Sequence, residues 1–316
     1  MSARADRAVM PPASDTLGLS PEELSELVRR ALAEDLGAGD LTTKWTVEPG
    51  ARARGTFVSQ QEAVVAGLGV AAAVFRELER AADFRILAEE GSLVKPGGAI
   101  AEARGAAATL LAGERVALNL IQHLSGIATL TRLFKEQLAG LKSELLDTRK
   151  TTPGLRSLEK YAVRVGGGRN HRMRLDYGVL IKNNHLRLAG GVRPAVERAR
   201  ANRPHASEFP IEVEVSNAEE LEEAIAAGAD RVLLDNMTPG MVKQCVALAA
   251  GRVLLEVSGG ITLANIRAYG ETGVDFISVG TLTHSAPAAS IHFLIEPDHA
   301  PSAPPHAGGR PGRGRA

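Results

Sequence analysis

The chain has 316 residues, 44% of them hydrophobic, which is enough for two domains or one large α/β domain. Lysine plus arginine and aspartate plus glutamate are equal at 37 each, so we expect neither nucleic acid nor a membrane surface as a partner. No apolar run approaches the roughly 20 residues of a membrane span. The single cysteine, Cys245, excludes an internal disulfide and fits a reducing compartment. We therefore expect a cytoplasmic protein with Cys245 as an inert core residue.

The two ends of the chain differ in composition from the rest. Residues 1–18 are small, polar and proline-bearing, and residues 297–316 are rich in Pro, Gly, Ala and Arg, so we expect two disordered tails. Between the tails, the first element is a helix. It begins after Ser20, which is followed by proline and two acids, and it stops near Gly37.

Residues 53–138 predict strands and helices in irregular order. We expect strands over 53–66 and 92–104, the second interrupted by Pro96, Gly97 and Gly98. A helix from Val70 to Phe84 lies between them. A long amphipathic helix then covers Leu110 to Leu138, either continuous or broken near Gly126. Such a mixture is typical of a small α+β domain, which we place over residues 19–120.

From residue 144 onward strands alternate with helices. The starts of the last four strands are about 20 to 22 residues apart, the length of one βα unit, which implies a parallel sheet. An open sheet and a closed barrel both fit. Polar groups follow nearly every strand, which favours an irregular α/β barrel over residues 121–287, complete or incomplete, with its site at that rim. The expected strands are Glu144–Asp147, Gly178–Lys182, Ile211–Val215, Arg231–Asp235, Arg252–Val257 and Val274–Val279.

The stretch from Asp147 to His185 concentrates positive charge around three glycines, Gly166 to Gly168. Cations beside tight glycine turns suit a site that holds several phosphates or carboxylates. A solvated basic helix explains the composition equally well. Some of these cations come immediately after a predicted strand, and that placement favours a site. The cations are Arg149, Lys150, Arg156, Lys160, Arg164, Arg169, His171, Arg172, Arg174 and Lys182.

The rim also offers carboxylates and glycine-bearing strand ends. The carboxylates are Glu214 and Asp235, and the strand ends are Ser258-Gly259-Gly260 and Ser278-Val279-Gly280. In barrel enzymes, glycine loops after the last strands form a phosphate site beside a helix N-terminus, which residues 262–269 are expected to supply. Cations together with a separate phosphate cradle predict two anionic partners, or one of very high charge.

Several polar residues have simpler interpretations. Glu256 ends a strand and is as well explained by an ion pair, so we leave it outside the site. Arg115 is explained by an ion pair with the adjacent Glu114. Arg156 and Arg164 are more plausibly structural or surface residues than ligand-binding ones.

Several blocks of this sequence resemble one enzyme family and occur in that family's order. The chain resembles quinolinate phosphoribosyltransferase, also called nicotinate-nucleotide pyrophosphorylase (carboxylating), over about residues 20–296. Asn183 is a departure, because the family more often has Asp there. The blocks are EDLGAGDLTT (34–43), GERVALNL (113–120), DTRKTTPGLR (147–156), GGGRNHRM (166–173), LIKNNH (180–185), EVEV (212–215), LLDNM (233–237), SGGI (258–261) and SVGTLTHSAP (278–287).

The resemblance implies a reaction and a fold. Quinolinate and 5-phosphoribosyl-1-pyrophosphate (PRPP) would give nicotinate mononucleotide, pyrophosphate and carbon dioxide, with Mg²⁺ held mainly through PRPP. The N-terminal domain would be an open-faced sandwich, rejoined by about residues 288–296. A homodimer is implied, with further assembly left open, in which Arg115 reaches the partner subunit's site.

The resemblance also implies roles for site residues. Lys150, Lys182, Glu214 and Asp235 would be catalytic, the two acids lying near the ribose hydroxyls and serving as candidate magnesium ligands. The carboxylates of quinolinate are assigned to Arg115, Arg149, Lys150, His171, Arg172 and Lys182. The 5-phosphate is assigned to Ser258, Gly259, Gly260 and Gly280, with Thr148 and Ser278 as further substrate-binding residues.

Two other interpretations stay open at this point. One is a related phosphoribosyltransferase of the same fold that acts on a different acid. The other is a barrel that binds anions without catalysis. Carboxylates that face a phosphorylated ligand argue against the second, because binding alone does not require them.

Overall fold

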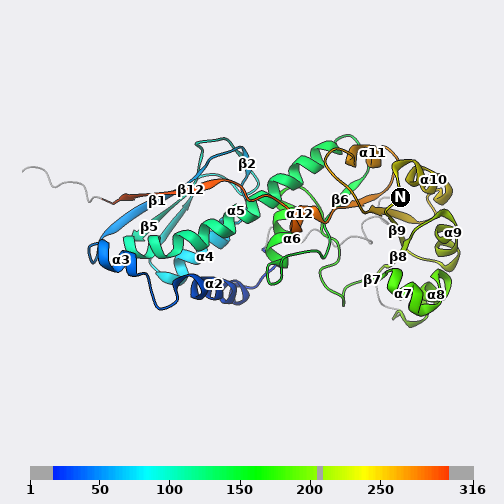
Figure 1. The fold of residues 1–316 in the computed structure, drawn as a ribbon, viewed down its shortest axis with the longest axis horizontal. Coiled ribbons are helices and arrows are strands. Elements are labelled where there is room, and N and C mark those ends of the chain that lie inside the picture. Colours follow the sequence, from blue (N-terminus) through cyan, green and yellow to red (C-terminus); the bar gives the residue numbers. More distant parts are fainter. Residues whose placement is uncertain (1–16, 205–208, 299–316) are drawn as a thin grey trace, which may run out of the picture.

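The computed structural model describes residues 17–204 and 209–298. The predicted disordered tails lie outside these residues, apart from positions 17, 18, 297 and 298. Of these, Pro297 closes a strand instead of opening a tail, since β12 runs over Ile291–Pro297. Figure 1 shows two parts, an antiparallel sheet with its helices and a parallel sheet with its helices, with the long helix α5 extending between them.

The N-terminal part is a four-stranded antiparallel sheet with the strand order β12-β1-β5-β3. Alternate residues of β1 (Arg52–Ser59) are buried, so the sheet has one apolar face. Helices α4 (Leu68–Leu78) and α5 (Ala107–Gln137) pack against the sheet, and α2 (Pro21–Leu36) packs on both helices. This is the expected open-faced sandwich. Its other elements are α3 (Leu41–Thr46), β2 (Ala63–Val64), β3 (Asp83–Ile86), β4 (Leu93–Val94) and β5 (Ala99–Ala106).

The last strand returns the chain to this sheet. β12 pairs antiparallel with β1 over seven residues, from Ser59 opposite Ile291 to Ala53 opposite Pro297. The rings of Phe57 and Phe293 are 4.5 Å apart between centroids, inside the core of the sandwich. A strand from the far end of the chain therefore contributes to the N-terminal core.

Two sequence expectations for this part need correction, and one open alternative is decided. The strand over 53–66 is two strands, β1 and β2. The helix over Val70 to Phe84 ends at Leu78, and Phe84 lies in β3, where its ring contacts Phe57. Helix α5 is continuous through Gly126. An added Cβ there would lie 2.1 Å from the carbonyl oxygen of Pro287, so the glycine allows a chain crossing and does not break the helix.

The C-terminal part is a six-stranded parallel sheet in the order β6-β11-β10-β9-β8-β7. All six expected strands are present, with ends shifted by up to two residues. Within residues 17–204 and 209–298, β6 and β7 form the two edges and do not pair, so the barrel is incomplete. One bridge between Leu146 and Arg169 extends the sheet beyond β6. The strands are β6 (Glu144–Leu146), β7 (Val179–Ile181), β8 (Ile211–Val215), β9 (Arg231–Asp235), β10 (Leu254–Ser258) and β11 (Phe276–Ser278).

Helices cover the outside of this curved sheet (Figure 1). Asn217 and Thr238 cap α9 and α10. Helix α11 is shorter than the expected 262–269, because the Thr262 N–H is held by the side chain of Asn265 and the helix begins only after that turn. The helices are α6 (Arg156–Val165), α7 (Asn183–Ala189), α8 (Val192–Asn202), α9 (Ala218–Ala227), α10 (Pro239–Ala249), α11 (Ile266–Gly270) and α12 (Thr281–His284).

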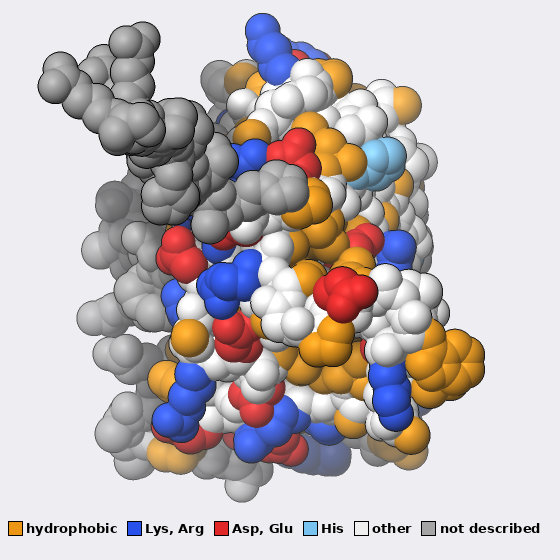
Figure 2. Space-filling view, turned by 90° about the vertical axis from the view of Figure 1, so that its left-hand side faces the viewer, with side chains coloured by type: hydrophobic (Ala, Val, Ile, Leu, Met, Phe, Trp, Pro, Cys, Tyr) orange, Lys and Arg blue, Asp and Glu red, His pale blue; other side chains and the backbone are white. Residues whose placement is uncertain are grey.

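Figure 2 views the sandwich end of the molecule, where charged side chains of both signs are interspersed with hydrophobic ones. Helix α3 lies at this end (Figure 1) and carries Trp45, whose residue surface is 75% exposed. In the part of the chain that the structure describes, no helix has the length and apolarity that crossing a bilayer would require.

Candidate active site

A pocket of about 500 Å³ lies at the carboxyl ends of the parallel strands. Every residue that the sequence and the resemblance placed in the site lines this pocket, except Arg115 and Gly280. Polar side chains from distant parts of the chain meet here because parallel strands all end at the same edge of the sheet. The lining residues are Thr148, Arg149, Lys150, His171, Arg172, Leu180, Lys182, Glu214, Leu233, Asp235, Asn236, Glu256, Ser258, Gly259, Gly260 and Ser278.

Two arginines bring positive charge and unsatisfied N–H donors to the pocket. The Nε atoms of Arg149 and Arg172 are buried and have no hydrogen-bond partner among the described residues. Burial, together with the charge of Arg149, lowers the pKa of Arg172. Arg172 Nη1 donates to the Gly178 carbonyl at 2.9 Å, but a buried Nε–H without an acceptor is costly. A bound carboxylate offers two acceptor oxygens in the matching planar geometry. The pair is therefore suited to an anionic ligand.

Lys182 and two carboxylates form another wall. Lys182 Nζ lies 3.2 Å from Glu214 Oε2, and the Lys182 N–H donates to His185 Nδ1 at 2.9 Å. Burial and the charge of Glu214 raise the pKa of Asp235, although Asn236 and the lysines of the pocket oppose the rise. Two acids thus share the pocket with cations, and only one of them has a lysine partner.

The backbone of Lys150 is held by two threonines that are far apart in the sequence. Its N–H donates to Thr148 Oγ1 at 3.0 Å, and its carbonyl accepts from Thr283 Oγ1 at 2.8 Å. Gly280 lies directly behind it, because an added Cβ there would be 3.1 Å from Lys150 Cδ and 3.2 Å from His284 Nε2. Gly280 therefore does not line the pocket itself, but its lack of a side chain leaves room for Lys150.

Helix α6 holds the segment that carries His171 and Arg172. Its Lys160 donates to Asp147, at the end of β6, and to the carbonyl of His171 at 3.0 Å. Asp147 accepts in turn from the His171 N–H at 2.8 Å and from Asn170 Nδ2 at 2.6 Å. Lys160 and Asp147 are fully buried. Sequence reasoning counted Lys160 only as one cation of the stretch, whereas the structure makes it a support for the site.

The preceding residue of α6 holds the other cationic loop. Glu159, also fully buried, accepts from the Thr152 N–H at 3.1 Å and contacts His123 Nε2 at 2.8 Å. Thr152 follows Lys150 by two positions. Consecutive residues of one helix therefore fix both cationic segments of the pocket.

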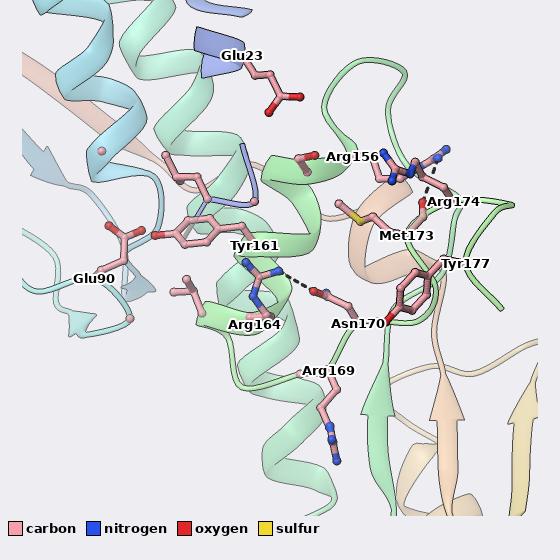
Figure 3. A pocket seen from close by; sticks show the side chains of 17 residues that line it. Glu23, Glu90, Arg156, Tyr161, Arg164, Arg169, Asn170, Met173, Arg174 and Tyr177 are labelled. Carbon is pink, nitrogen blue, oxygen red and sulfur yellow. Dashed lines mark hydrogen bonds between the residues drawn. The ribbon is translucent and has the colours of Figure 1, made fainter. Parts of the chain in front are cut away.

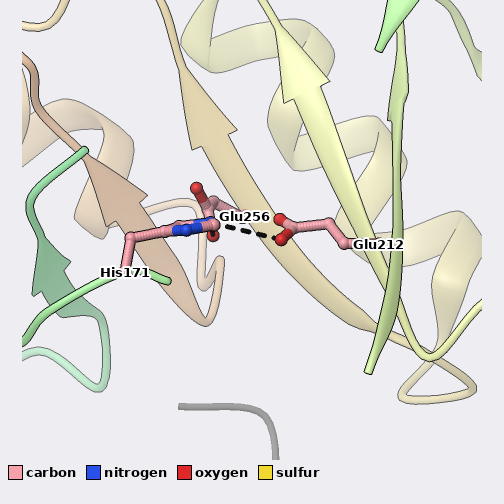
Figure 4. A group of neighbouring side chains, drawn as sticks. All are labelled: His171, Glu212 and Glu256. Atoms are coloured by element: carbon pink, nitrogen blue, oxygen red, sulfur yellow. Dashed lines mark ion pairs between the residues drawn. The ribbon is translucent and has the colours of Figure 1, made fainter. Parts of the chain in front are cut away.

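Below the pocket lies a buried cluster of ionisable groups, shown in part in Figure 4. His171 Nε2 is 3.2 Å from Glu212 Oε2 and 3.6 Å from Glu256 Oε2, and Arg231 Nη1 is 2.9 Å from Glu256 Oε2. The Arg172 N–H donates to His171 Nδ1 at 2.8 Å, so the ring proton lies on Nε2, toward the acids. Both ring nitrogens therefore face protein groups, and the contact of His171 with a substrate carboxylate stays a prediction.

The two acids of the cluster differ in acidity. Burial alone would raise the pKa of Glu212, but Arg231 and His171 hold it at about 2. Burial and the charge of Glu212 raise the pKa of Glu256. His171, Glu212 and Glu256 have the spacing of a metal site. However, Arg231 already supplies a cation beside both carboxylates, 3.9 Å from Glu212, which argues for an ion-pair network. Glu256 thus forms the expected ion pair and lines the pocket as well.

The loop after β10 has little room for side chains and a backbone conformation that favours glycine. Gly259 and Gly260 have φ angles of +98° and +63°, a region that suits glycine. An added Cβ at Gly259 would lie 2.2 Å from Asn236 Oδ1. Helix α11 begins only at Ile266, and its N-cap residue Asn265 contacts the loop, because Asn265 Nδ2 donates to the Gly260 carbonyl at 2.9 Å. The phosphate cradle at this loop stays a prediction.

Sequence reasoning missed three further lining residues, Leu180, Leu233 and Asn236. All three lie inside the blocks 180–185 and 233–237, next to residues that were chosen. Arg115, in contrast, is exposed on α5 and lies outside this pocket. Among the described residues it forms no ion pair with Glu114, so the simple interpretation of Arg115 does not hold.

A second, wider pocket of about 1290 Å³ lies between the start of α2 and helix α6. Figure 3 shows Glu23 and Glu90 on one side and several arginines on the other. Arg164 donates to Asn170 Oδ1 at 2.6 Å, and Arg156 donates to Thr151 Oγ1 at 2.9 Å. Both arginines thus hydrogen-bond to neighbouring protein groups, as a structural role requires.

Comparisons with known proteins agree with this arrangement. Family models described as "Quinolinate phosphoribosyl transferase, N-terminal domain" and "Quinolinate phosphoribosyl transferase, C-terminal domain" match residues 40–125 and 127–293. A "Probable nicotinate-nucleotide pyrophosphorylase [carboxylating]" of Synechocystis is 46% identical over 78% of this chain and 84% of that protein. Its counterpart from Mycobacterium leprae is 44% identical over 82% of this chain and 93% of that protein.

A solved structure shares the fold. The nicotinate-nucleotide pyrophosphorylase from Francisella tularensis superposes with a TM-score of 0.83 at 39% identity, covering 90% of this chain and 100% of that chain. This chain therefore has the overall fold of that enzyme. The chain belongs to the quinolinate phosphoribosyltransferase family.

Proposed function

We infer that the chain transfers the phosphoribosyl group of PRPP to quinolinate and releases pyrophosphate and carbon dioxide, forming nicotinate mononucleotide for NAD biosynthesis. One observation carries this inference best. Arg149 and Arg172 present buried Nε–H donors without acceptors to the same pocket that holds the glycine loop at Gly259. Quinolinate has two carboxylates for such donors, and PRPP has a phosphate for the loop.

The proposed chemistry needs positioning and charge. The ring nitrogen of quinolinate attacks the anomeric carbon while the bond to pyrophosphate breaks, and positive charge develops on the ribose. Glu214 and Asp235 would stabilise that charge, and Lys182 and Lys150 would hold the anions. The bond between the ring and the adjacent carboxylate then breaks. Carbon dioxide leaves, the electron pair stays on the ring carbon beside the quaternised nitrogen, and a proton takes its place. We assign the neighbouring cation to Lys150.

Magnesium fits the same wall of the pocket. Mg²⁺ is usually bound by one or two carboxylates together with substrate phosphates, and Glu214 and Asp235 supply two carboxylates to the pocket. Because Lys182 compensates Glu214, Asp235 is the better ligand of the two. When bound, the ion would neutralise the departing pyrophosphate.

We further propose a homodimer in which Arg115 completes the site of the partner subunit. Arg115 is exposed on the half of α5 that packs in the sandwich, away from its own pocket. An exposed arginine outside its own site can serve a second copy through a two-fold interface. We place the enzyme in the cytoplasm, where Cys245, a buried free thiol, would stay reduced.

One experiment tests the reaction. The protein is incubated with quinolinate, PRPP and Mg²⁺, and nicotinate mononucleotide is sought by mass spectrometry while released pyrophosphate is measured. Parallel reactions replace quinolinate by pyridine acids with one carboxylate. Product from another acid but not from quinolinate would indicate a related phosphoribosyltransferase. Binding of both ligands without pyrophosphate release would indicate a non-catalytic anion-binding barrel.

A further inference from the structure

Asn236 has an unusual backbone conformation at the edge of the pocket. Its φ angle is 54°, and among the described residues Ala250 is the one other residue besides glycine with a positive φ. Side chains with a Cβ pay of order 1 kcal/mol or more to occupy this left-handed region, and asparagine tolerates it best after glycine. Such strain persists only where the surroundings impose it, and it is often found at functional sites.

The contacts of Asn236 explain what imposes the conformation. Its N–H donates to the carbonyl of Ser258 at 2.9 Å, one step beyond the last paired residues of β9 and β10. The left-handed turn brings the side chain back over the strand end. There, Nδ2 donates to Asp235 Oδ2 at 2.9 Å. The orientation of the amide follows from chemistry, since an ionised carboxylate accepts only.

The other end of the amide faces the glycine loop. Asn236 Oδ1 is so close to Gly259 that a Cβ there would lie 2.2 Å from Oδ1 and 2.7 Å from Cγ. The amide therefore fills the space between the carboxylate of Asp235 and the backbone of the loop. It touches the two parts of the pocket that the proposed reaction assigns to PRPP.

We propose that Asn236 is a positioning residue for PRPP: its amide fixes the carboxylate of Asp235 and holds the loop at Gly259 in register with it. The inference rests on the proposed function. Asparagine combines tolerance of the left-handed backbone with a short planar amide that donates to Asp235 and fits against Gly259. Aspartate has the shape but repels its neighbour and cannot donate, and glycine has the backbone freedom but no amide.

The decisive variant is Asn236→Gly, because glycine relieves the strain and removes only the side chain. Its Tm should equal or exceed that of the wild type, while kcat/KM for PRPP falls about tenfold, the effect of losing one hydrogen bond to a charged group. KM for quinolinate should change by less than about twofold. Asn236→Asp should show the same split between the substrates with a larger loss for PRPP, because a like charge then faces Asp235.

Ala250→Gly is the matched control. Ala250 has a φ of 48° at the end of α10, outside the pocket. This variant should have a higher Tm than the wild type, with kcat/KM for PRPP and KM for quinolinate unchanged.

Wild-type turnover of quinolinate and PRPP is measured first, and its absence would overturn the proposed function and this inference with it. If the wild type is active, two results overturn the role of Asn236 alone. One is an Asn236→Gly variant as efficient with PRPP as the wild type. The other is a loss that falls equally on both substrates or that follows a lowered Tm, which would make the side chain merely structural.

Discussion

The ammonium group of Lys160 joins the start of the cationic stretch to its middle by contacting the carboxylate of Asp147 and the carbonyl of His171. Neither charged side chain is exposed. Burial raises the pKa of Asp147 and lowers that of Lys160, and the opposite charge of each partner opposes both shifts. Removing one partner would leave the other charge buried and unpaired, which costs far more than an exposed pair contributes.

Lys160→Met should therefore lower the free energy of unfolding by about 3–5 kcal/mol. Lys142→Met is the control, since Lys142 pairs with Asp275 at 3.0 Å with 58% of its side chain exposed, and it should cost about 1 kcal/mol or less. Denaturant unfolding followed by circular dichroism measures both. Equal small effects would mean that the Lys160 pair contributes no more than a surface pair.

Lys150→Ala and Lys182→Ala should each reduce turnover with little change in stability. Both lysines line the pocket, and each charge-assisted contact with an anionic substrate is worth roughly 1.5–3 kcal/mol, a loss of about 10- to 100-fold. Lys243→Ala, an exposed position on α10, should be neutral in the same assay. Near-normal turnover in either pocket variant would refute its assignment to the site.

Gly259→Ala should abolish PRPP binding and spare quinolinate binding. The new Cβ would meet the Asn236 amide at 2.2 Å in addition to the strain of φ +98°, so the loop must move. Gly251→Ala isolates the second effect, because Gly251 has φ +74° and open space around its Cβ position. The control should cost roughly 1–2 kcal/mol of stability and no PRPP affinity. Calorimetry with each ligand gives the comparison, and unchanged PRPP affinity in Gly259→Ala would contradict it.

Asp235→Asn should be inactive yet slightly more stable than the wild type at neutral pH. Burial and the charge of Glu214 raise the pKa of Asp235 in the fold, so its ionisation costs stability above that pKa. The cost disappears as the pH falls below the ordinary aspartate pKa, because the carboxyl is then protonated in both states. The Tm difference between variant and wild type should therefore shrink from pH 7 to pH 3. A difference that grows toward low pH would contradict the sign.

A mixture of Arg115→Ala and Lys182→Ala subunits tests the shared site. Each variant alone should be inactive. Random reassortment makes half of the dimers mixed, and each mixed dimer has one intact site, so roughly a quarter of wild-type activity should return. Native mass spectrometry confirms that subunits have exchanged. Exchange without recovery would place Arg115 outside the partner's site.

The sequence alone predicted the parallel strands and most of the pocket. Buried parallel strands contain continuous apolar runs, so the strand over Arg231–Asp235, with Val232, Leu233 and Leu234 at its centre, was found with its ends. Residues just after such strands converge at one rim, which is why Lys150, Lys182 and Asp235 could be grouped without coordinates. The predicted ends of helices and strands were wrong where tertiary contacts outweighed the local preference for a helix. Phe84, for example, was placed at the end of a helix but lies in a strand and packs in the aromatic core.

Only the tertiary structure decided which of the other charges support the site. Lys160, Arg231 and Glu256 look like ordinary charged residues in the sequence, and their burial follows from pairings with Asp147 and between β9 and β10 across 13 and 25 positions. The left-handed turn at Asn236 likewise depends on the end of β10. The spacing of apolar residues within a short segment predicts whether that segment forms a helix or a strand. The burial of a charge depends on which distant segments enclose it, and that is fixed only when the chain has folded.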